Sequence, residues 1–208
     1  MTILSHRGVW DDSHQKNALD TLLLSLELGF GLETDIRDFN GKIVISHDMP
    51  TGDECLFERF LGEYQDKGFD LTLALNVKAD GLQDDVMDLL QRYLVTNYFF
   101  FDMSVPDQLG YRKKGLNYLS RQSEYETSPS LYADSFGVWL DCFESVWYDK
   151  EVLERHLVAG KRVCVVSEEL HGRSNAKQWE LLRKMPFVND NRLYLCTDFP
   201  QKANEYFL

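Results

Sequence analysis

The chain has 208 residues, enough for a sizeable hydrophobic core, which excludes a mini-protein held together only by disulfides or metals. Hydrophobic residues make up 44% and charged residues 27%, as in soluble globular proteins, so a disordered chain is excluded. The 22 basic and 34 acidic residues give a net charge of −12. This negative field disfavours nucleic acids and anionic membranes as partners.

The compartment follows from what the sequence lacks. No basic leader precedes an apolar stretch at the start, and no apolar run approaches the roughly 20 residues of a membrane-spanning helix. The four cysteines are scattered, and three lie inside apolar runs, as reduced buried thiols do. We therefore expect a cytoplasmic protein without stable membrane insertion.

Short apolar runs rich in β-branched and aromatic residues predict eight strands, several of them apolar at consecutive positions, as strands buried on both faces are. In chain order they are residues 3–5, 31–36, 71–77, 98–102, 117–121, 137–141, 162–166 and 193–197. No linker rich in proline, glycine or serine divides the chain, so we expect one domain over residues 1–208.

Helical spacing of apolar residues separates several of these strands. It predicts helices over residues 19–28, 82–94, 150–159 and 174–184. Asn40-Gly41 lies between two strand-like runs, 34–37 and 42–46, and predicts a hairpin. Alternating strands and helices indicate parallel βα units, so the predicted fold is a compact (β/α)₈ barrel with a small hairpin insertion after the second strand.

Ligands of parallel barrels bind at the carboxyl ends of the strands, so polar residues at those ends are the candidate site. Two histidines, several carboxylates and several cations occur there. They are His6, Arg7, Glu33, Asp35, His47, Asp48, Asn76, Lys78, Asp102, Arg121 and Asp141.

Glu33 and Asp35 are separated by one residue, so on a strand both side chains point to the same side. Two carboxylates so placed repel each other unless a cation lies between them, and an oxygen-ligated ion such as Mg²⁺ or Ca²⁺ fits there. Taken alone, the pair is equally compatible with two surface acids on a half-exposed strand.

The neighbouring residues favour chemistry. His6 and His47 flank the acidic pair, and imidazoles titrate near neutral pH, as a general acid and a general base need to. Arg7 presents a fork that suits phosphate oxygens, and Lys78 adds a point charge. Together these groups suit displacement at a phosphodiester.

The ordered motifs of the first 80 residues resemble the glycerophosphodiester phosphodiesterase family, barrels related to the phosphatidylinositol-specific phospholipases C. The motifs are His6-Arg7-Gly8, Asn17, Glu33-Thr34-Asp35-Ile36, Asn40-Gly41 and Val44-Ile45-Ser46-His47-Asp48, and Thr197-Asp198-Phe199-Pro200 resembles the family's last strand.

The resemblance implies a metal-dependent phosphodiesterase acting on a small phosphodiester. It implies that His6 and His47 are the acid/base pair, and that Arg7 and Lys78 contact the phosphate. It also implies that Glu33 and Asp35 hold the divalent metal.

Two positions depart from the family pattern. Lys16 stands where the family usually has Glu. Asn76 stands where it usually has an acid that serves as the third metal ligand. An Asn oxygen can bind a hard cation, but the ligand set loses one negative charge, so we expect weaker metal binding. Asp102 or Asp141 remain candidates to compensate.

Other readings stay open. A catalytically silent barrel would bind a phosphorylated metabolite or a partner protein, and a metal-dependent lyase or isomerase would use the acidic pair for an enolate.

Arg121, Asp141 and Trp139 are candidate substrate contacts. For Arg121 the alternative is a salt bridge to Glu124 or Asp102, and for Trp139 it is core packing. Attack by a neighbouring hydroxyl would form a cyclic phosphate first.

Overall fold

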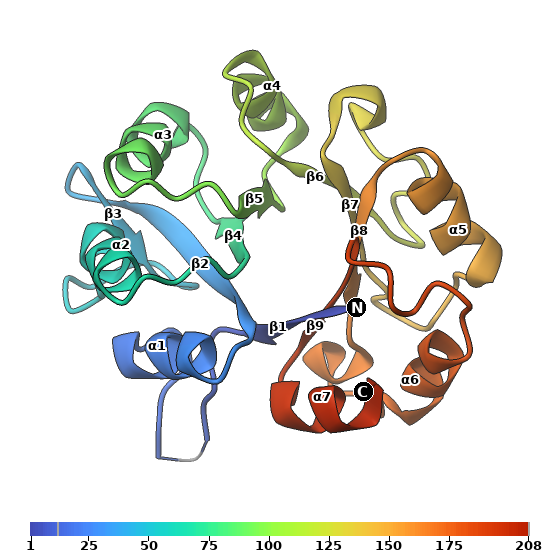
Figure 1. The fold of residues 1–208 in the computed structure, drawn as a ribbon. Coiled ribbons are helices and arrows are strands. Elements are labelled where there is room, and N and C mark those ends of the chain that lie inside the picture. The colour runs from blue at the N-terminus through green and yellow to red at the C-terminus, as the bar shows by residue number, and fades with distance from the viewer. Residues whose placement is uncertain (12, 208) are drawn as a thin grey trace. The chain divides into compact units, whose positions relative to one another are not determined.

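The structure is a computed structural model that describes residues 1–11 and 13–207. They form two compact units, residues 5–118 and residues 1–4 with the chain from residue 119 onward. Figure 1 shows strands and helices alternating along the chain. That the chain is one domain stays a prediction.

The unit of residues 5–118 carries a parallel sheet with one antiparallel addition. Strand β2 (Gly31–Phe39) pairs in parallel with β4 (Leu73–Val77), and β4 pairs with β5 (Tyr98–Phe101). Strand β3 (Lys42–Ile45) returns antiparallel beside β2. This hairpin is the predicted insertion after the second strand. The first strand, β1 (Thr2–His6), ends in this unit.

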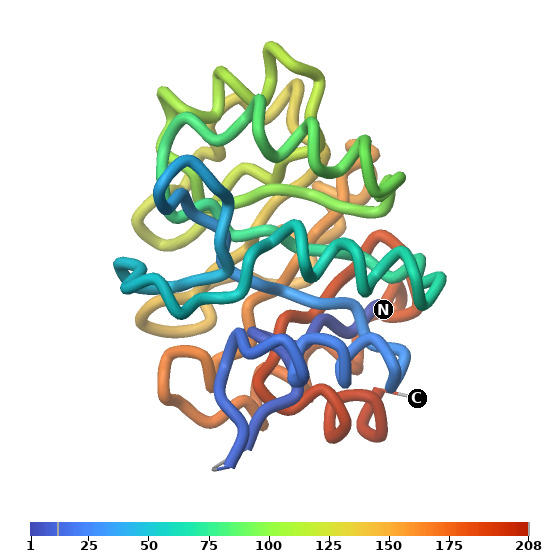
Figure 2. The backbone as a smooth tube through the Cα atoms, turned by 90° about the vertical axis from the view of Figure 1, so that its left-hand side faces the viewer, coloured from blue at the N-terminus to red at the C-terminus, as the bar shows by residue number. Residues whose placement is uncertain are grey.

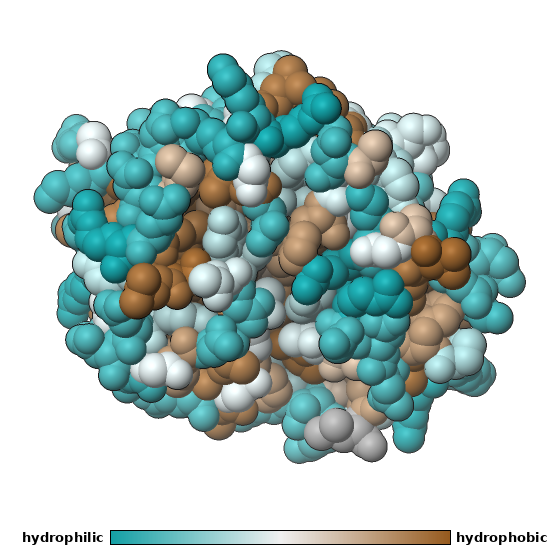
Figure 3. All heavy atoms as spheres, turned by 45° about the horizontal axis from the view of Figure 1, so that its top comes forward, coloured by the Kyte–Doolittle hydropathy of each residue, from teal (hydrophilic) through white to brown (hydrophobic). Residues whose placement is uncertain are grey.

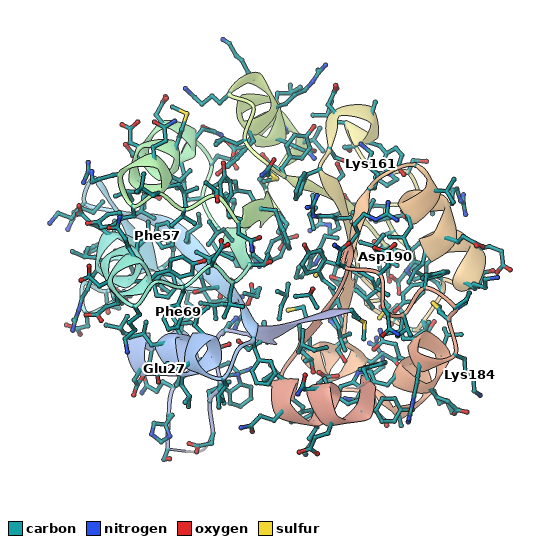
Figure 4. The ribbon with its side chains drawn as sticks, in the orientation of Figure 1. Glu27, Phe57, Phe69, Lys161, Lys184 and Asp190 are labelled. Atoms are coloured by element: carbon teal, nitrogen blue, oxygen red, sulfur yellow. The ribbon has the colours of Figure 1, made fainter. Side chains whose placement is uncertain are left out.

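Four helices accompany these strands, and Figure 2 shows α1, α2 and α3 side by side on the outer face of this unit. They are α1 (Leu19–Glu27), α2 (Phe57–Asp66), α3 (Gln83–Arg92) and α4 (Val105–Lys113). A row of ring contacts runs along the buried face of α2 from Phe57 through Phe60 and Tyr64 to Phe69 in the following loop, and Figure 4 labels Phe57 and Phe69 at its two ends.

The second unit repeats the parallel pattern in the order β6-β7-β8-β9. Its strands are β6 (Leu119–Gln122), β7 (Gly137–Leu140), β8 (Arg162–Val166) and β9 (Leu193–Thr197). Its helices are α5 (Lys150–Val158), α6 (Ala176–Arg183) and α7 (Pro200–Phe207), with short 3₁₀ helices over Tyr132–Asp134 and Glu168–His171.

The element order confirms the compact (β/α)₈ fold. Each predicted strand is present, and β6 is followed by a 3₁₀ turn instead of an α-helix, which shortens the chain. Helices α2, α4 and α7 are additions to the predicted set. Within the described residues, no helix is both long and apolar enough to cross a bilayer. The face drawn in Figure 3 is mostly hydrophilic, with apolar residues in small groups.

Candidate active site

The acidic pair on β2 is buried within the unit of residues 5–118. Glu33 is 1% exposed and Asp35 is 0% exposed. The parallel register of β2 and β4 places Asn76 beside Asp35, so the residue that replaces the family's third acid adjoins the pair. The structure thus brings together all three residues that the sequence assigns to the metal.

Arg7 reaches the acidic pair from the turn that follows β1. Its backbone N–H donates to the Glu33 carbonyl (2.9 Å) and lies 3.2 Å from Glu33 Oε2, and its side-chain Nε lies 2.8 Å from Asp35 Oδ2. Arg7 adopts a left-handed φ of 59°, which is uncommon outside glycine. Gly8 follows at φ 92°, where a Cβ would meet the Thr21 backbone at 2.7 Å.

Lys78 lies on the other side of Asp35. Its Nζ is 3.4 Å from Asp35 Oδ1 and 3.8 Å from Asp102 Oδ2. Asp102 directly follows β5 and has a left-handed φ of 71°. Two cations therefore face Asp35, and a third carboxylate reaches the same lysine from the neighbouring strand.

Burial changes the acidity of Glu33. Loss of water around this carboxyl raises its pKa to about 8, and the neighbouring Asp35 charge adds to the increase. Arg7, Lys78 and a hydrogen bond with the Asn76 side chain act in the opposite direction. With no ion bound, Glu33 is therefore largely protonated at neutral pH, while Asp35 faces Arg7 and Lys78.

Asn17 is a site residue whose contact was not predicted, although it stands in the quoted motif. Its Nδ2 donates to Asp35 Oδ2 (2.8 Å), and its Oδ1 accepts from the Thr34 hydroxyl (2.9 Å). Its left-handed φ of 62° turns the chain before α1. Asn17 therefore fixes the orientation of the Asp35 carboxylate from the loop that precedes α1.

His6 lies beside the acidic pair. Its Nε2 is 3.9 Å from Glu33 Oε2, and its side chain is 12% exposed. The indole N–H of Trp10 donates to the His6 carbonyl (3.0 Å), which ties the following loop to the end of β1.

His47 lies two residues after β3, the returning strand of the inserted hairpin. Its Nδ1 is 2.9 Å from Asp48 Oδ1, and its side chain is 45% exposed. The loop before α1 and the segment that links β3 to α2 line an open pocket of about 840 Å³, which both Arg7 and His47 line. A phosphate bound at Arg7 would share this pocket with His47. The volume falls in the range of small-molecule sites.

The oxygen atoms near Asp35 fit a hard cation. Asp35 Oδ1 and Asn76 Oδ1 are buried and have no hydrogen-bond partner among the described residues. Within residues 1–11 and 13–207, no three side chains of His, Cys, Asp or Glu are grouped so that they could hold a metal. An ion held beside Glu33 and Asp35 would have the Asn76 amide oxygen as its third protein donor.

The three candidate substrate contacts all belong to the other unit. Arg121 forms an ion pair, as the alternative interpretation expects, but its partner is Glu126 and not one of the two acids named there. Trp139 is 5% exposed, as core packing requires. Asp141 Oδ1 lies 2.7 Å from His171 Nε2, so this carboxylate has a partner of its own.

Solved structures resemble this chain over almost its full length. The candidate glycerophosphodiester phosphodiesterase of Galdieria sulphuraria matches with a TM-score of 0.75 at 18% identity, over 99% of this chain and 97% of that one. The glycerophosphodiester phosphodiesterase of Agrobacterium tumefaciens C58 matches with a TM-score of 0.68 at 14% identity, over 99% and 98%.

A third structure agrees with these two. The glycerophosphoryl diester phosphodiesterase of Parabacteroides distasonis matches with a TM-score of 0.66 at 13% identity, over 99% of this chain and 85% of that one. No protein-family model and no curated protein matches the sequence. The chain thus has the fold of these glycerophosphodiester phosphodiesterase structures, and it resembles that family in the order of its N-terminal motifs as well.

Proposed function

We propose that this chain is a metal-dependent phosphodiesterase that cleaves a small glycerophosphodiester, with His6 and His47 as the acid/base pair. One observation carries the proposal: Arg7 contacts the buried Asp35 and also lines the pocket that His47 lines. A phosphate bound by Arg7 would therefore lie beside the acidic pair and within a pocket that contains an exposed imidazole.

In this proposal, Arg7 and Lys78 bind and orient the phosphate oxygens. Asp35 holds the guanidinium of Arg7 in place, and Asn17 in turn holds the Asp35 carboxylate. Glu33, Asp35 and Asn76 would hold Mg²⁺ or Ca²⁺, which supplies charge stabilisation at the phosphate when it is bound. The buried Glu33 has to release its proton before its carboxylate can bind the metal ion.

One histidine removes a proton from the attacking oxygen, which belongs to water or to a neighbouring substrate hydroxyl. A new P–O bond forms, and the bond to the leaving alcohol breaks. The other histidine donates its proton to the leaving alkoxide, so protons balance over the step. Attack by a hydroxyl gives a cyclic phosphate, which a second attack by water opens.

A catalytically silent barrel is the second candidate, and the pairing of Asp35 favours it. Arg7 and Lys78 already face this carboxylate, and Asn76 adds no charge, so the unit could bind a phosphorylated metabolite without turnover. The two candidates differ in their response to metal, because only an ion that binds the folded chain raises its melting temperature.

The test is release of glycerol phosphate from glycerophosphoglycerol, with added Mg²⁺ or Ca²⁺ and with chelator. The proposal expects turnover that chelator removes and that either ion restores. Binding of the diester with no release under any of these conditions would support the silent barrel instead.

A further inference from the structure

Lys78, which the proposed function assigns to the phosphate, belongs to a short loop between two elements. Strand β4 ends at Val77, and α3 begins at Gln83. The backbone N–H of Lys78 donates to the Ile36 carbonyl (2.9 Å), which fixes the first residue of this loop to the sheet. Lysine has a flexible four-carbon side chain, so the position of its charge depends on how the rest of the loop is held.

The end of this loop is held by a carboxylate of the next helix, that of Asp107 in α4. Its Oδ1 accepts hydrogen bonds from the Gly81 backbone N–H (2.9 Å) and from the Gln83 side-chain amide. Asp107 is 9% exposed, and hydrogen bonds to a carboxylate are stronger than those between neutral groups. Gly81 has a left-handed φ of 90°, so Asp107 holds the loop where the chain turns sharply.

A second set of contacts runs from the loop to the start of α4. The Ser104 hydroxyl accepts from the Asp107 N–H (3.3 Å) and donates to the Asp80 carboxylate (3.1 Å to Oδ2). Asp80 belongs to the loop of Lys78. Ser104 follows Asp102 by two residues, and Asp102 Oδ2 lies 3.8 Å from Lys78 Nζ. The loop that carries Lys78 and the segment that carries Asp102 are therefore tied together by side chains from both.

The second carboxylate oxygen of Asp107 has no such contacts. Oδ2 is buried and has no hydrogen-bond partner among the described residues. An unpaired buried polar atom costs free energy, and an apolar side chain at this position would avoid that cost. The hydrogen bonds of Oδ1 to the loop therefore account for a carboxylate at this position.

We propose that Asp107 is a positioning residue of the candidate active site: it fixes the loop of residues 78–82 so that Lys78 is held at the phosphate. Asp107 is not among the residues that line the pocket, so it acts through Lys78 and not on the substrate. This inference rests on the proposed phosphodiesterase function and adds a residue to its machinery.

Two substitutions that remove the same charge test whether the hydrogen bonds of Asp107 matter. Asp107→Asn keeps an oxygen that can accept from the Gly81 N–H, whereas Asp107→Ala has none. We expect amide hydrogen exchange of residues 79–82 to become at least tenfold faster in Asp107→Ala and to stay within threefold of wild type in Asp107→Asn. Binding of glycerol 3-phosphate, measured by calorimetry on the folded variants, should weaken at least tenfold and less than threefold, respectively.

A double-mutant cycle with Lys78→Ala distinguishes positioning from a general loss of stability. With Lys78 present, Asp107→Ala should lower kcat/KM for glycerophosphoglycerol at least tenfold, mainly through a higher KM. Without the Lys78 side chain, the same substitution should lower kcat/KM less than threefold further, because the group that it positions is gone.

Unchanged exchange in Asp107→Ala, or equal losses of kcat/KM with and without the Lys78 side chain, would overturn the inference. The wild-type protein keeps the two proposals apart. If it neither binds glycerol 3-phosphate nor cleaves the diester, the phosphodiesterase function fails, and the role of Asp107 at the phosphate fails with it. Wild-type turnover that Asp107→Ala leaves intact would refute only the positioning role.

Discussion

Nε of Arg7 lies 2.8 Å from Oδ2 of Asp35, a carboxylate that is completely buried. Asn17 donates to the same oxygen, and Lys78 lies near the other one. The charge of Asp35 is thus balanced by neighbours in the fold, and Arg7 has both a structural role and the proposed phosphate-binding role. The stability of a variant without the Arg7 side chain tests the structural role separately from phosphate binding.

Removing the Arg7 side chain should destabilise the protein strongly. Arg7→Ala leaves the buried Asp35 carboxylate with the neutral Asn17 amide and a more distant lysine, and a broken buried pair typically costs about 3 kcal/mol or more. The control is Arg92→Ala, because Arg92 pairs with Glu58 on the exposed surface, where a pair contributes less than about 1 kcal/mol. Urea unfolding measures the loss of unfolding free energy in both variants. Equal losses would contradict a strongly stabilising ion pair between Arg7 and the buried Asp35.

Stability should decrease with rising pH because of Glu33. Its native pKa of about 8 exceeds the ordinary value of 4.5, so between these pH values the folded state holds a proton that the unfolded state releases. In chelator, the free energy of unfolding should therefore fall between pH 5 and pH 8, by at most about 1.4 kcal/mol per pH unit. Glu33→Gln should remove this decrease. Parallel curves for wild type and variant would show that Glu33 does not titrate abnormally.

Asn76→Glu should tighten metal binding. The substitution restores one negative charge next to Asp35, and we expect the dissociation constant for Mg²⁺ to decrease about tenfold, which corresponds to about 1.4 kcal/mol. Asn76→Gln is the matched control, with similar size and no charge. Calorimetry measures the Mg²⁺ dissociation constants of both variants. If Asn76→Gln binds Mg²⁺ as tightly as Asn76→Glu, the added charge is not the cause of the tighter binding.

Much of the fold could be predicted because buried parallel strands have a clear pattern. Residues 99–101 are three consecutive phenylalanines and form most of β5. Helix α2 was missed, although Phe57, Phe60, Leu61 and Tyr64 have helical spacing, because Gly62 interrupts a short segment. Helix α4 has a readable start, since the Ser104 hydroxyl accepts from the Asp107 N–H, but its hydrophobic pattern is weak.

The site could be predicted in part, because the strand ends of a parallel sheet meet at one edge. The convergence of Glu33, Asp35, Asn76 and Lys78 follows from that rule and from the register of β2 and β4. The contact of Asn17 with Asp35 could not be predicted, because it depends on a left-handed turn in a loop. The pairing of Arg121 with Glu126 depends in the same way on the loop after β6.

The most direct test of the account is kcat/KM for glycerophosphoglycerol, measured with Mg²⁺ on wild type, His6→Ala and His47→Ala. General acid–base catalysis contributes roughly 10²- to 10⁴-fold, so we expect each substitution to lower kcat/KM at least 100-fold while the folded structure is retained. Unchanged rates in either variant would contradict the proposed acid/base pair.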